Sequence, residues 1–458
     1  MQNMTLGNPL RLIITFSIPL LISNLFQQLY SISDIILVGR LIGVKALAAV
    51  GAAAPVFFLL IMVSIGFTNG LTVISAQSFG AKNYRRLRRS VTTATTLSLS
   101  FTIIFSAIML LFLDFTLHLM NVPEEIYQDT KKFLLVIGFG GVMIVAFNLL
   151  SGFMRALGDS KSPLYFLVFT TLMNILLNVV FIYYMKMGVE GSALGTVTAM
   201  TLSVICCLIY MKKHFQILKP EASDWKLEWK FCAEHLRIAV PMAIQFSIIA
   251  ISAAVTQTIC NKFGFETIAA MTAAMRVEQL AVQPMVSLGI AMATFVAQNY
   301  GAGRIGRVRR GVFESSMISV AMSIVFAILM FWGGKYVIGI FVTKEQPELV
   351  DTVISMSLTY LNISILFYTF LGQIFIFRNS CQGMGNSVAP MISSIVELLM
   401  RIFAAIYLAS KFGFVGLCYA SPLAWIGGAL VVSGGYFWTI KKINRQIHKK
   451  RWSMYNLQ

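Results

Sequence analysis

Long, nearly uninterrupted runs of apolar residues divide the chain into twelve segments, which short polar stretches separate. A helix needs about 20 mostly apolar residues to cross a bilayer, and each segment is at least that long. The segments are 10–38, 46–79, 90–113, 128–157, 162–185, 189–211, 231–260, 266–299, 311–342, 349–380, 387–410 and 414–440. Because the apolar residues are continuous rather than alternating, the pattern predicts membrane-spanning α-helices and not barrel strands.

The second half of the chain repeats the first at an offset of about 222 residues. Pro19 in the first segment matches Pro241 in the seventh, and the Gln-x-x-Gly-Ala endings at 77–81 and 298–302 match each other. Each repeat holds six segments, an even number, so both halves enter the membrane in the same direction. We therefore expect an all-α polytopic membrane protein with two six-helix lobes, related by a pseudo-two-fold axis along the membrane normal.

The repeat also predicts the domain organisation. We expect an N-lobe at 1–211, a polar cytoplasmic linker at 212–230, a C-lobe at 231–440 and a basic cytoplasmic tail at 441–458. Two equal lobes that face each other across a cleft are typical of alternating-access carriers.

Composition and charge support the membrane assignment. Only 12% of the residues are charged and 57% are hydrophobic, whereas a soluble chain carries about 25% charged residues. The net charge of +18 lies mostly in alternate loops, with 25 Lys and Arg on one side of the membrane and nine on the other. This asymmetry predicts a multi-pass protein of the cell membrane with both termini in the cytoplasm, and argues against a nucleic-acid partner.

The sequence carries no catalytic motif, and its one cofactor-like match is discounted: Gly301-Ala-Gly303-Arg-Ile-Gly306 fits G-x-G-x-x-G, but it follows a membrane segment and not a strand, so it does not indicate dinucleotide binding. It has no P-loop, the six cysteines show no paired spacing, and the four histidines form no cluster along the chain. We therefore expect no enzyme activity, no cofactor and no use of ATP. The expected partners are the lipid bilayer and a small amphipathic substrate, and the chain is expected to act as a monomer.

A polar stripe marks the first segment. Gln27, Tyr30 and Asp34 follow one another at steps of three and four, so they share one helical face. An ionisable group inside a span costs roughly 2.5–3.5 kcal/mol, so Asp34 is expected to serve a function, such as binding H⁺ or a hard monovalent cation. Pro19 lies four turns earlier and removes a backbone hydrogen bond, which predicts a hinge.

Further polar pairs recur at helical spacing in the first half. Asn174 and Asn178 share a face of the fifth segment, and Ser192 and Thr196 share a face of the sixth. Either hydrogen bonds between helices or ligation of a cation would explain them. Asn148 lies in the fourth segment and could line a cavity.

The second half has charged residues inside its segments. Glu397 and Arg401 are oppositely charged and four residues apart, so we expect them to pair. Arg276 and Glu278 are two apart and face differently, so each needs its own partner. Two interpretations remain: Arg276, Glu397 and Arg401 form a static polar network, or some of these charges contact substrate.

Taken together, several motifs resemble the multidrug and toxic compound extrusion (MATE) transporters, over about residues 8–440. They are the Asp34-Ile-Ile-Leu-Val-Gly39 run after Pro19, the two Gln-x-x-Gly-Ala endings and Arg155-Ala-Leu-Gly158-Asp159. The resemblance implies export of amphipathic, often cationic compounds such as drugs and metabolites, in exchange for H⁺ or Na⁺ by alternating access. It also implies a cation site in the N-lobe, with Na⁺ as the only metal ion. The residues that map onto that site are Asp34, Asn174, Asn178, Ser192 and Thr196.

The substrate is expected to meet Gln27, Tyr30 and Asn148 in the N-lobe and Glu278 in the C-lobe. Tyr30 offers a ring face for cation–π attraction, and a carboxylate offsets a cationic ligand's charge. The alternative function is a flippase for a lipid-linked saccharide on a related two-lobed fold. A flippase would favour several cationic groups around a pyrophosphate, and the spans of the C-lobe offer only Arg276 and Arg401.

Overall fold

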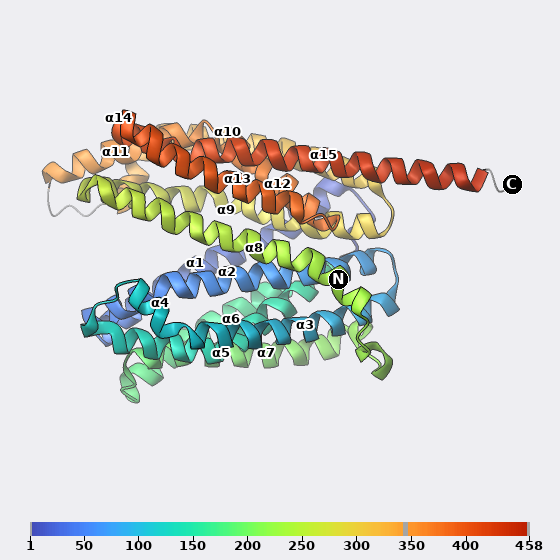
Figure 1. Cartoon of the computed structure of the whole chain (residues 1–458), viewed down its shortest axis with the longest axis horizontal. Helices are drawn as coiled ribbons and strands as arrows, with labels where there is room; N and C mark the ends of the chain where they lie inside the picture. Colours follow the sequence, from blue (N-terminus) through green and yellow to red (C-terminus); the bar gives the residue numbers. More distant parts are fainter. Residues whose placement is uncertain (1, 342–346, 456–458) are drawn as a thin grey trace. The chain divides into compact units, whose positions relative to one another are not determined.

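The computed structural model describes residues 2–341 and 347–455, and the regular elements in these ranges are all helices (Figure 1). The helices of the first half are α1 (Pro9–Leu41), α2 (Val44–Gly80), α3 (Tyr84–Leu111), α4 (Leu113–Leu119), α5 (Glu124–Ala156), α6 (Lys161–Asn178), the π-helical turn η1 (Val179–Tyr184) and α7 (Gly188–His214). Short 3-10 turns η2 (Gln216–Leu218) and η3 (Ala222–Trp225) follow in the linker.

The second half continues in the same way. Its elements are α8 (Trp229–Cys260), the 3-10 turn η4 (Asn261–Phe263), α9 (Phe265–Gly301), α10 (Ile305–Phe341), α11 (Pro347–Ile365), α12 (Tyr368–Gly383), α13 (Val388–Phe403), the π-helical turn η5 (Ala404–Leu408), α14 (Ala409–Cys418) and α15 (Ala420–Tyr455).

The described residues contain eleven helical stretches long and apolar enough to cross a membrane, and twelve if the bent pair α11 and α12 counts as one span. The prediction of an all-α polytopic membrane protein is therefore confirmed. Two details differ from the sequence prediction. The tenth span is bent by 53° between Ile365 and Tyr368, and the eleventh runs on to Cys418. Gly413, where a boundary was predicted, instead kinks the helix with φ 58°, a left-handed value that glycine adopts readily.

The chain forms two compact units. The first contains most of α1 and all of α2 to α7, and the second contains most of α9 and all of α10 to α15. Two helices are shared between the units: α1 passes from one to the other after Ile14, and α8 passes after Ser247. Each carries a proline near that point, Pro19 in α1 and Pro241 in α8.

Two glycines of α2 allow the first part of α8 to pack closely within the first unit. A Cβ atom on Gly70 would lie 2.4 Å from Ala239 Cα, and one on Gly66 would lie 2.6 Å from the Met242 carbonyl oxygen. Only a residue without a side chain fits at either position. This Gly-x-x-x-Gly pair therefore serves close helix packing, as it does in many membrane proteins.

The linker after α7 is anchored on α3. Arg88 Nε lies 3.0 Å from Asp224 Oδ2, Thr92 donates to the Asp224 carbonyl oxygen at 2.6 Å, and Arg89 pairs with Glu228. Burial by itself would raise the pKa of the Asp224 carboxyl group. The Glu221 backbone N–H and the Arg88 guanidinium stabilise its charged form, so its pKa lies below the ordinary value.

We expect Asp224→Asn to loosen this anchor, because it removes the charged partner of Arg88 from a side chain that is only 2% exposed. If the free energy that holds the linker on α3 falls by about 1–3 kcal/mol, the fraction of molecules with an open linker rises about fivefold or more. Trypsin cleavage after Lys226 in the detergent-solubilised protein measures that opening. The pKa of Asp224 is lower in the folded protein than in the unfolded chain. The stabilisation from the anchor is therefore complete above the pKa of the unfolded chain, and it is lost as the pH falls through the lower pKa of the folded protein.

The matched control is Glu221→Gln. Glu221 also pairs with Arg88, at 2.7 Å, but it is 66% exposed, and such a pair is worth about 0–1 kcal/mol. Equal cleavage of the Asp224→Asn and Glu221→Gln proteins would contradict the anchoring role of Asp224.

Candidate functional site

Asp34 of α1 is held by side chains from two other helices. Its Oδ1 accepts hydrogen bonds from Asn178 Nδ2 of α6 at 2.8 Å and from Ser192 Oγ of α7 at 3.2 Å. Both donors are neutral, and no described Lys, Arg or His side chain forms an ion pair with this carboxylate. The carboxylate charge is therefore stabilised by dipoles alone.

The hydrogen bonds continue from Asp34 into a ring that returns to α1. Asn178 Nδ2 lies 3.2 Å from Asn174 Oδ1, and Asn174 Nδ2 donates to Thr196 Oγ1 at 3.2 Å. The Thr196 hydroxyl lies 3.1 Å from the Tyr30 hydroxyl. The ring thus joins the five residues predicted for a cation site, and it adds Tyr30, which was assigned to the substrate.

The ring lies deep in the first unit. The side chains of Asn174, Asn178 and Ser192 are fully buried and Thr196 is 5% exposed, whereas Asp34 and Tyr30 of α1 are half-buried. Among the described residues, Asn178 Oδ1 is a buried oxygen with no hydrogen-bond partner. Carboxylate, amide and hydroxyl oxygens are the donor types that a hard monovalent cation prefers, so the set fits Na⁺ as well as H⁺.

A glycine allows Asn178 to reach its position. A Cβ atom on Gly195 of α7 would lie 2.1 Å from Asn178 Oδ1, so only glycine leaves room for the amide. The helix also widens into the π-helical turn η1 directly after Asn178, and such turns are frequent at functional sites. The sequence does not reveal this role of Gly195, because the residue that needs the space, Asn178, comes from another helix.

Two predicted substrate residues of the first unit lie outside the ring. Gln27 is exposed on α1, and Asn148 Nδ2 donates to the Ile144 carbonyl oxygen of its own helix at 3.0 Å. Arg155, also on α5, donates to Asn69 Oδ1 at 3.1 Å. The described hydrogen bonds therefore connect Tyr30, but neither Gln27 nor Asn148, to Asp34.

In the second unit, Glu278 of α9 has a partner that the sequence did not reveal. Tyr360 of α11 donates its hydroxyl to Glu278 Oε2 at 2.8 Å, and Tyr360 is 1% exposed. The other carboxylate oxygen, Oε1, is buried without a partner among the described residues. The sequence offered one hint of this contact: Tyr360 lies within an apolar segment, and a buried tyrosine hydroxyl needs a polar partner.

The predicted pairing of Glu397 with Arg401 is wrong. Glu397 of α13 pairs with Arg378 of α12, and it also accepts from Ser393 Oγ at 3.0 Å. Arg401 instead donates to Ser252 Oγ of α8 at 2.6 Å. The spacing along one helix predicts contacts within that helix only. Here neighbouring helices supply the partners of both Glu397 and Arg401. Arg276 is exposed and has no ion pair among the described residues, so the predicted three-residue network does not form.

The described residues contain no cluster of three or more His, Cys, Asp or Glu side chains that could hold a metal ion. The group around Asp34 has one carboxylate, a charge that suits a single small cation better than a tightly held multivalent metal.

The chain matches a family model described as MatE over residues 19–180 and 241–407. It is 28% identical to the "Probable multidrug resistance protein YoeA" of Bacillus subtilis (strain 168), over 94% of this chain and 95% of that protein. It is 25% identical to the "Probable multidrug resistance protein NorM" of Thermotoga maritima, over 91% of this chain and 88% of that protein.

Solved structures show the same fold. A structure titled "Crystal structure of MATE in complex with MaL6" aligns with a TM-score of 0.88 at 20% identity and covers 97% of this chain and 99% of that one. Another, titled "Crystal structure of MATE in the bent conformation", aligns with a TM-score of 0.86 at 21% identity, over 96% of this chain and 97% of that one.

We expect a double-mutant cycle to distinguish the partners of Glu397. Arg378→Met leaves a carboxylate that is only 14% exposed without its cation, so this change should lower the melting temperature of the purified protein, and adding Glu397→Gln should recover part of the loss. The coupling should amount to about 0.5–3 kcal/mol.

Arg401→Met serves as the matched comparison, because Arg401 is on the same helix as Glu397 but bonds to Ser252. The losses of stability caused by Arg401→Met and by Glu397→Gln should add without coupling in the double variant. Strong coupling in the Arg401 cycle with none in the Arg378 cycle would contradict the observed pairing.

Proposed function

The chain belongs to the MatE family, the multidrug and toxic compound extrusion transporters, and on that premise we propose that it exports amphipathic, often cationic, organic compounds in exchange for H⁺ or Na⁺. The names of its relatives in Bacillus and Thermotoga, both multidrug resistance proteins, support a broad substrate class. The hydrogen-bonded ring around Asp34 is the observation on which the coupling part of the proposal rests.

We propose that the coupling cation acts by neutralising Asp34. Hydrogen bonds to an ionised carboxylate are about twice as strong as those between neutral groups, so neutralisation weakens the bonds from Asn178 and Ser192. These bonds connect α1 to α6 and α7. With them weakened, α1 can repack, and Pro19 supplies a point at which the helix bends at low cost.

The cation can drive transport only through a difference in its affinity for two conformations of the protein. The ring provides such a difference, because Asp34 is surrounded by donors only while α1 lies against α6 and α7. A conformation in which α1 has bent away offers the carboxylate fewer donors and a different affinity for the cation. Alternating access follows if substrate favours the opposite conformation.

The orientation of the amides favours H⁺ over Na⁺. Asn178 directs its Nδ2 donor, rather than its oxygen, at Asp34, and Ser192 also donates. A Na⁺ ion would need the Asn178 amide to turn and present its oxygen, whereas a proton needs only the carboxylate. Asn178 Oδ1 has no hydrogen-bond partner among the described residues, but it packs against Gly195 while Nδ2 faces Asp34, so this oxygen could ligate Na⁺ beside Asp34 only after the amide turned.

We also propose the cell membrane as the location, with both termini and the linker in the cytoplasm and a monomer as the transporting unit that uses no ATP. Glu278, Gln27, Tyr30 and Asn148 remain the proposed substrate contacts. The structure does not favour a flippase, which would need several free cationic groups, because of Arg276 and Arg401 the second already donates to Ser252.

We expect Asp34→Asn to abolish gradient-driven export while the protein still folds, because an amide cannot exchange a cation. Purified protein in liposomes, loaded with a fluorescent organic cation, tests this with an imposed pH gradient and, separately, an imposed Na⁺ gradient. If H⁺ is the coupling ion, a pH gradient alone should drive export by the parent protein.

The matched control is Asp114→Asn, the same chemical change at an exposed acid of α4 that pairs with Lys131. It should export at the parent rate. Export by folded Asp34→Asn protein against a concentration gradient would reject Asp34 as the coupling group. Na⁺ rather than H⁺ would be the coupling ion if export depended on the Na⁺ gradient and not on the pH gradient, and if Asn178→Ala weakened that export.

We expect Glu278→Gln to lower the export of cationic substrates relative to neutral ones of similar size, because it removes a buried negative charge. Competition between a cation and a neutral analogue in the same liposomes measures that ratio. Tyr360→Phe is the control, since it removes the hydrogen bond to Glu278 but keeps the charge. An unchanged ratio in Glu278→Gln would exclude Glu278 from substrate selection.

A further inference from the structure

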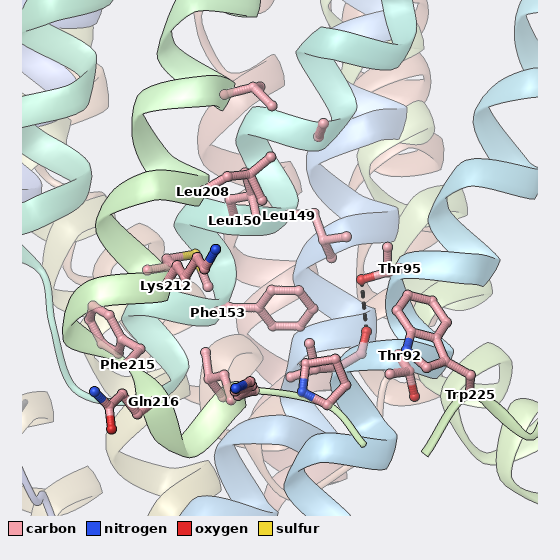
Figure 2. A pocket seen from close by; sticks show the side chains of 17 residues that line it. Thr92, Thr95, Leu149, Leu150, Phe153, Leu208, Lys212, Phe215, Gln216 and Trp225 are labelled. Carbon is pink, nitrogen blue, oxygen red and sulfur yellow. Dashed lines mark hydrogen bonds between the residues drawn. The ribbon is translucent and has the colours of Figure 1, made fainter. Parts of the chain in front are cut away.

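A cavity of about 530 Å³ lies within the first unit, at the end where the linker is anchored (Figure 2). Its floor is formed by α5, which contributes Leu149, Leu150 and Phe153, and α3 and α7 both pack on α5 and flank it. The linker closes the end through Phe215 and Trp225. Its volume falls within the range of about 300–1,000 Å³ that is usual for small-molecule sites.

The apolar part of the cavity is continuous with the lipid-facing side of α7. Leu208 lines the cavity and is 52% exposed, and its neighbours Ile205 and Ile209 are also exposed. In a membrane-spanning helix, exposed aliphatic side chains of this kind contact lipid tails. An acyl chain can therefore enter the cavity from the bilayer without crossing water.

Positive charge lies at the linker end of the cavity. Lys212 and Lys219 both belong to the lining, both are exposed, and neither has an ion pair among the described residues. The acids nearby are already engaged, since Glu221 and Asp224 pair with Arg88. The half-exposed indole of Trp225 borders the same end, and indole rings favour the boundary between lipid tails and headgroups.

We propose that this cavity binds an anionic phospholipid, with one acyl chain against α5 and the phosphate group at Lys212 and Lys219. Such lipids are enriched on the cytoplasmic face of membranes and are attracted by lysines placed at a helix end. Two lysine ammonium groups disfavour a cationic drug as the occupant. They equally disfavour the basic tail of this chain, which carries Lys441 and Lys442.

The contacts that hold the linker on α3 indicate that the cavity is a preformed binding site. Arg88, Arg89 and Thr92 of α3 hold the linker segment that carries Trp225, so the cavity end keeps its shape. A bound lipid would then connect α3, α5, α7 and the linker. Lipid bound there would stabilise the first unit regardless of whether transport is taking place, so the proposal goes beyond the transport function.

Quenching of Trp225 fluorescence tests the proposal. The purified full chain is placed in nanodiscs of phosphatidylcholine that contain either brominated phosphatidylglycerol or brominated phosphatidylcholine. The difference between the parent and Trp225→Phe isolates the signal of this indole. Phosphatidylglycerol should quench more strongly at equal content, and Lys212→Ala with Lys219→Ala should lower that preference about fivefold for each lysine.

The charge control is Lys213→Ala with Lys226→Ala, which removes the same charge from the same region at residues outside the cavity lining. It should keep the preference. Leu208→Phe and, separately, Ala146→Phe fill the cavity without changing charge, and each should reduce quenching by phosphatidylglycerol. Inorganic phosphate, which has no acyl chain, should not displace the lipid.

Four outcomes would overturn the proposal. The first is equal quenching of the parent by the two lipids, and the second is an equal loss of preference in the control pair, which would mean general surface charge. The third is unchanged quenching in both folded Phe variants, which would mean that no chain enters the cavity. The fourth is displacement by inorganic phosphate, which would mean a site for a free anion.

Discussion

The bilayer offers no hydrogen-bond partners, so every polar group inside a span must find one within the protein. This constraint accounts for the long helices, which satisfy their own backbone groups, and for where the polar side chains lie. The buried hydroxyls of Thr68, Thr102 and Ser380 donate to carbonyl oxygens of their own helices at 2.7 Å. Such residues can stand in an apolar segment without any function, because their own helix satisfies them.

Carboxylates and guanidinium groups cannot be satisfied in that way, and Asp34 and Glu397 are stabilised differently. In the second unit, Glu397 has Arg378 as a cationic partner, with Ser393 as an additional donor. In the first unit, Asp34 has only neutral donors. Breaking a buried ion pair is strongly unfavourable, whereas a carboxylate held by dipoles can accept a cation and remain within the same hydrogen-bond network.

The helices and several of the site residues could be predicted from the sequence, for a physical reason. The apolar runs are longer than any soluble helix needs, and spacings of three and four residues fix which side chains share a face. Asp34, Asn174 and Thr196 therefore pointed to polar faces on three helices, and these faces do meet in one ring. The spacings could not show which atoms would bond, because that depends on how neighbouring helices pack.

The errors and omissions follow from the same limit. Arg401 is four residues from Glu397 on one helix, but Ser252 of another helix lies within its reach, and Arg378 occupies Glu397. Tyr360 lies 82 positions from Glu278 in the sequence, so no local pattern connects them. Gly195 has a role only because Asn178 packs on it. The linker anchor on Arg88 and Thr92 was likewise invisible from spacing, since its partners are more than 130 residues away.

The internal repeat makes the difference between the units informative about the mechanism. The repeat places Glu397 and Arg401 at the positions that Asn174 and Asn178 hold in the first half. Amides there surround an acid that comes from another helix, and the cluster carries one unbalanced negative charge. In the second half, the charge of Glu397 is already balanced by Arg378. A site can exchange a coupling cation only where a negative charge lacks a permanent partner. The contrast between Asp34 and Glu397 supports the first unit as the place of coupling. In the second unit, Glu278 accepts from the Tyr360 hydroxyl and lies within electrostatic reach of Arg401, so a cationic substrate there would meet a carboxylate whose charge is already partly offset.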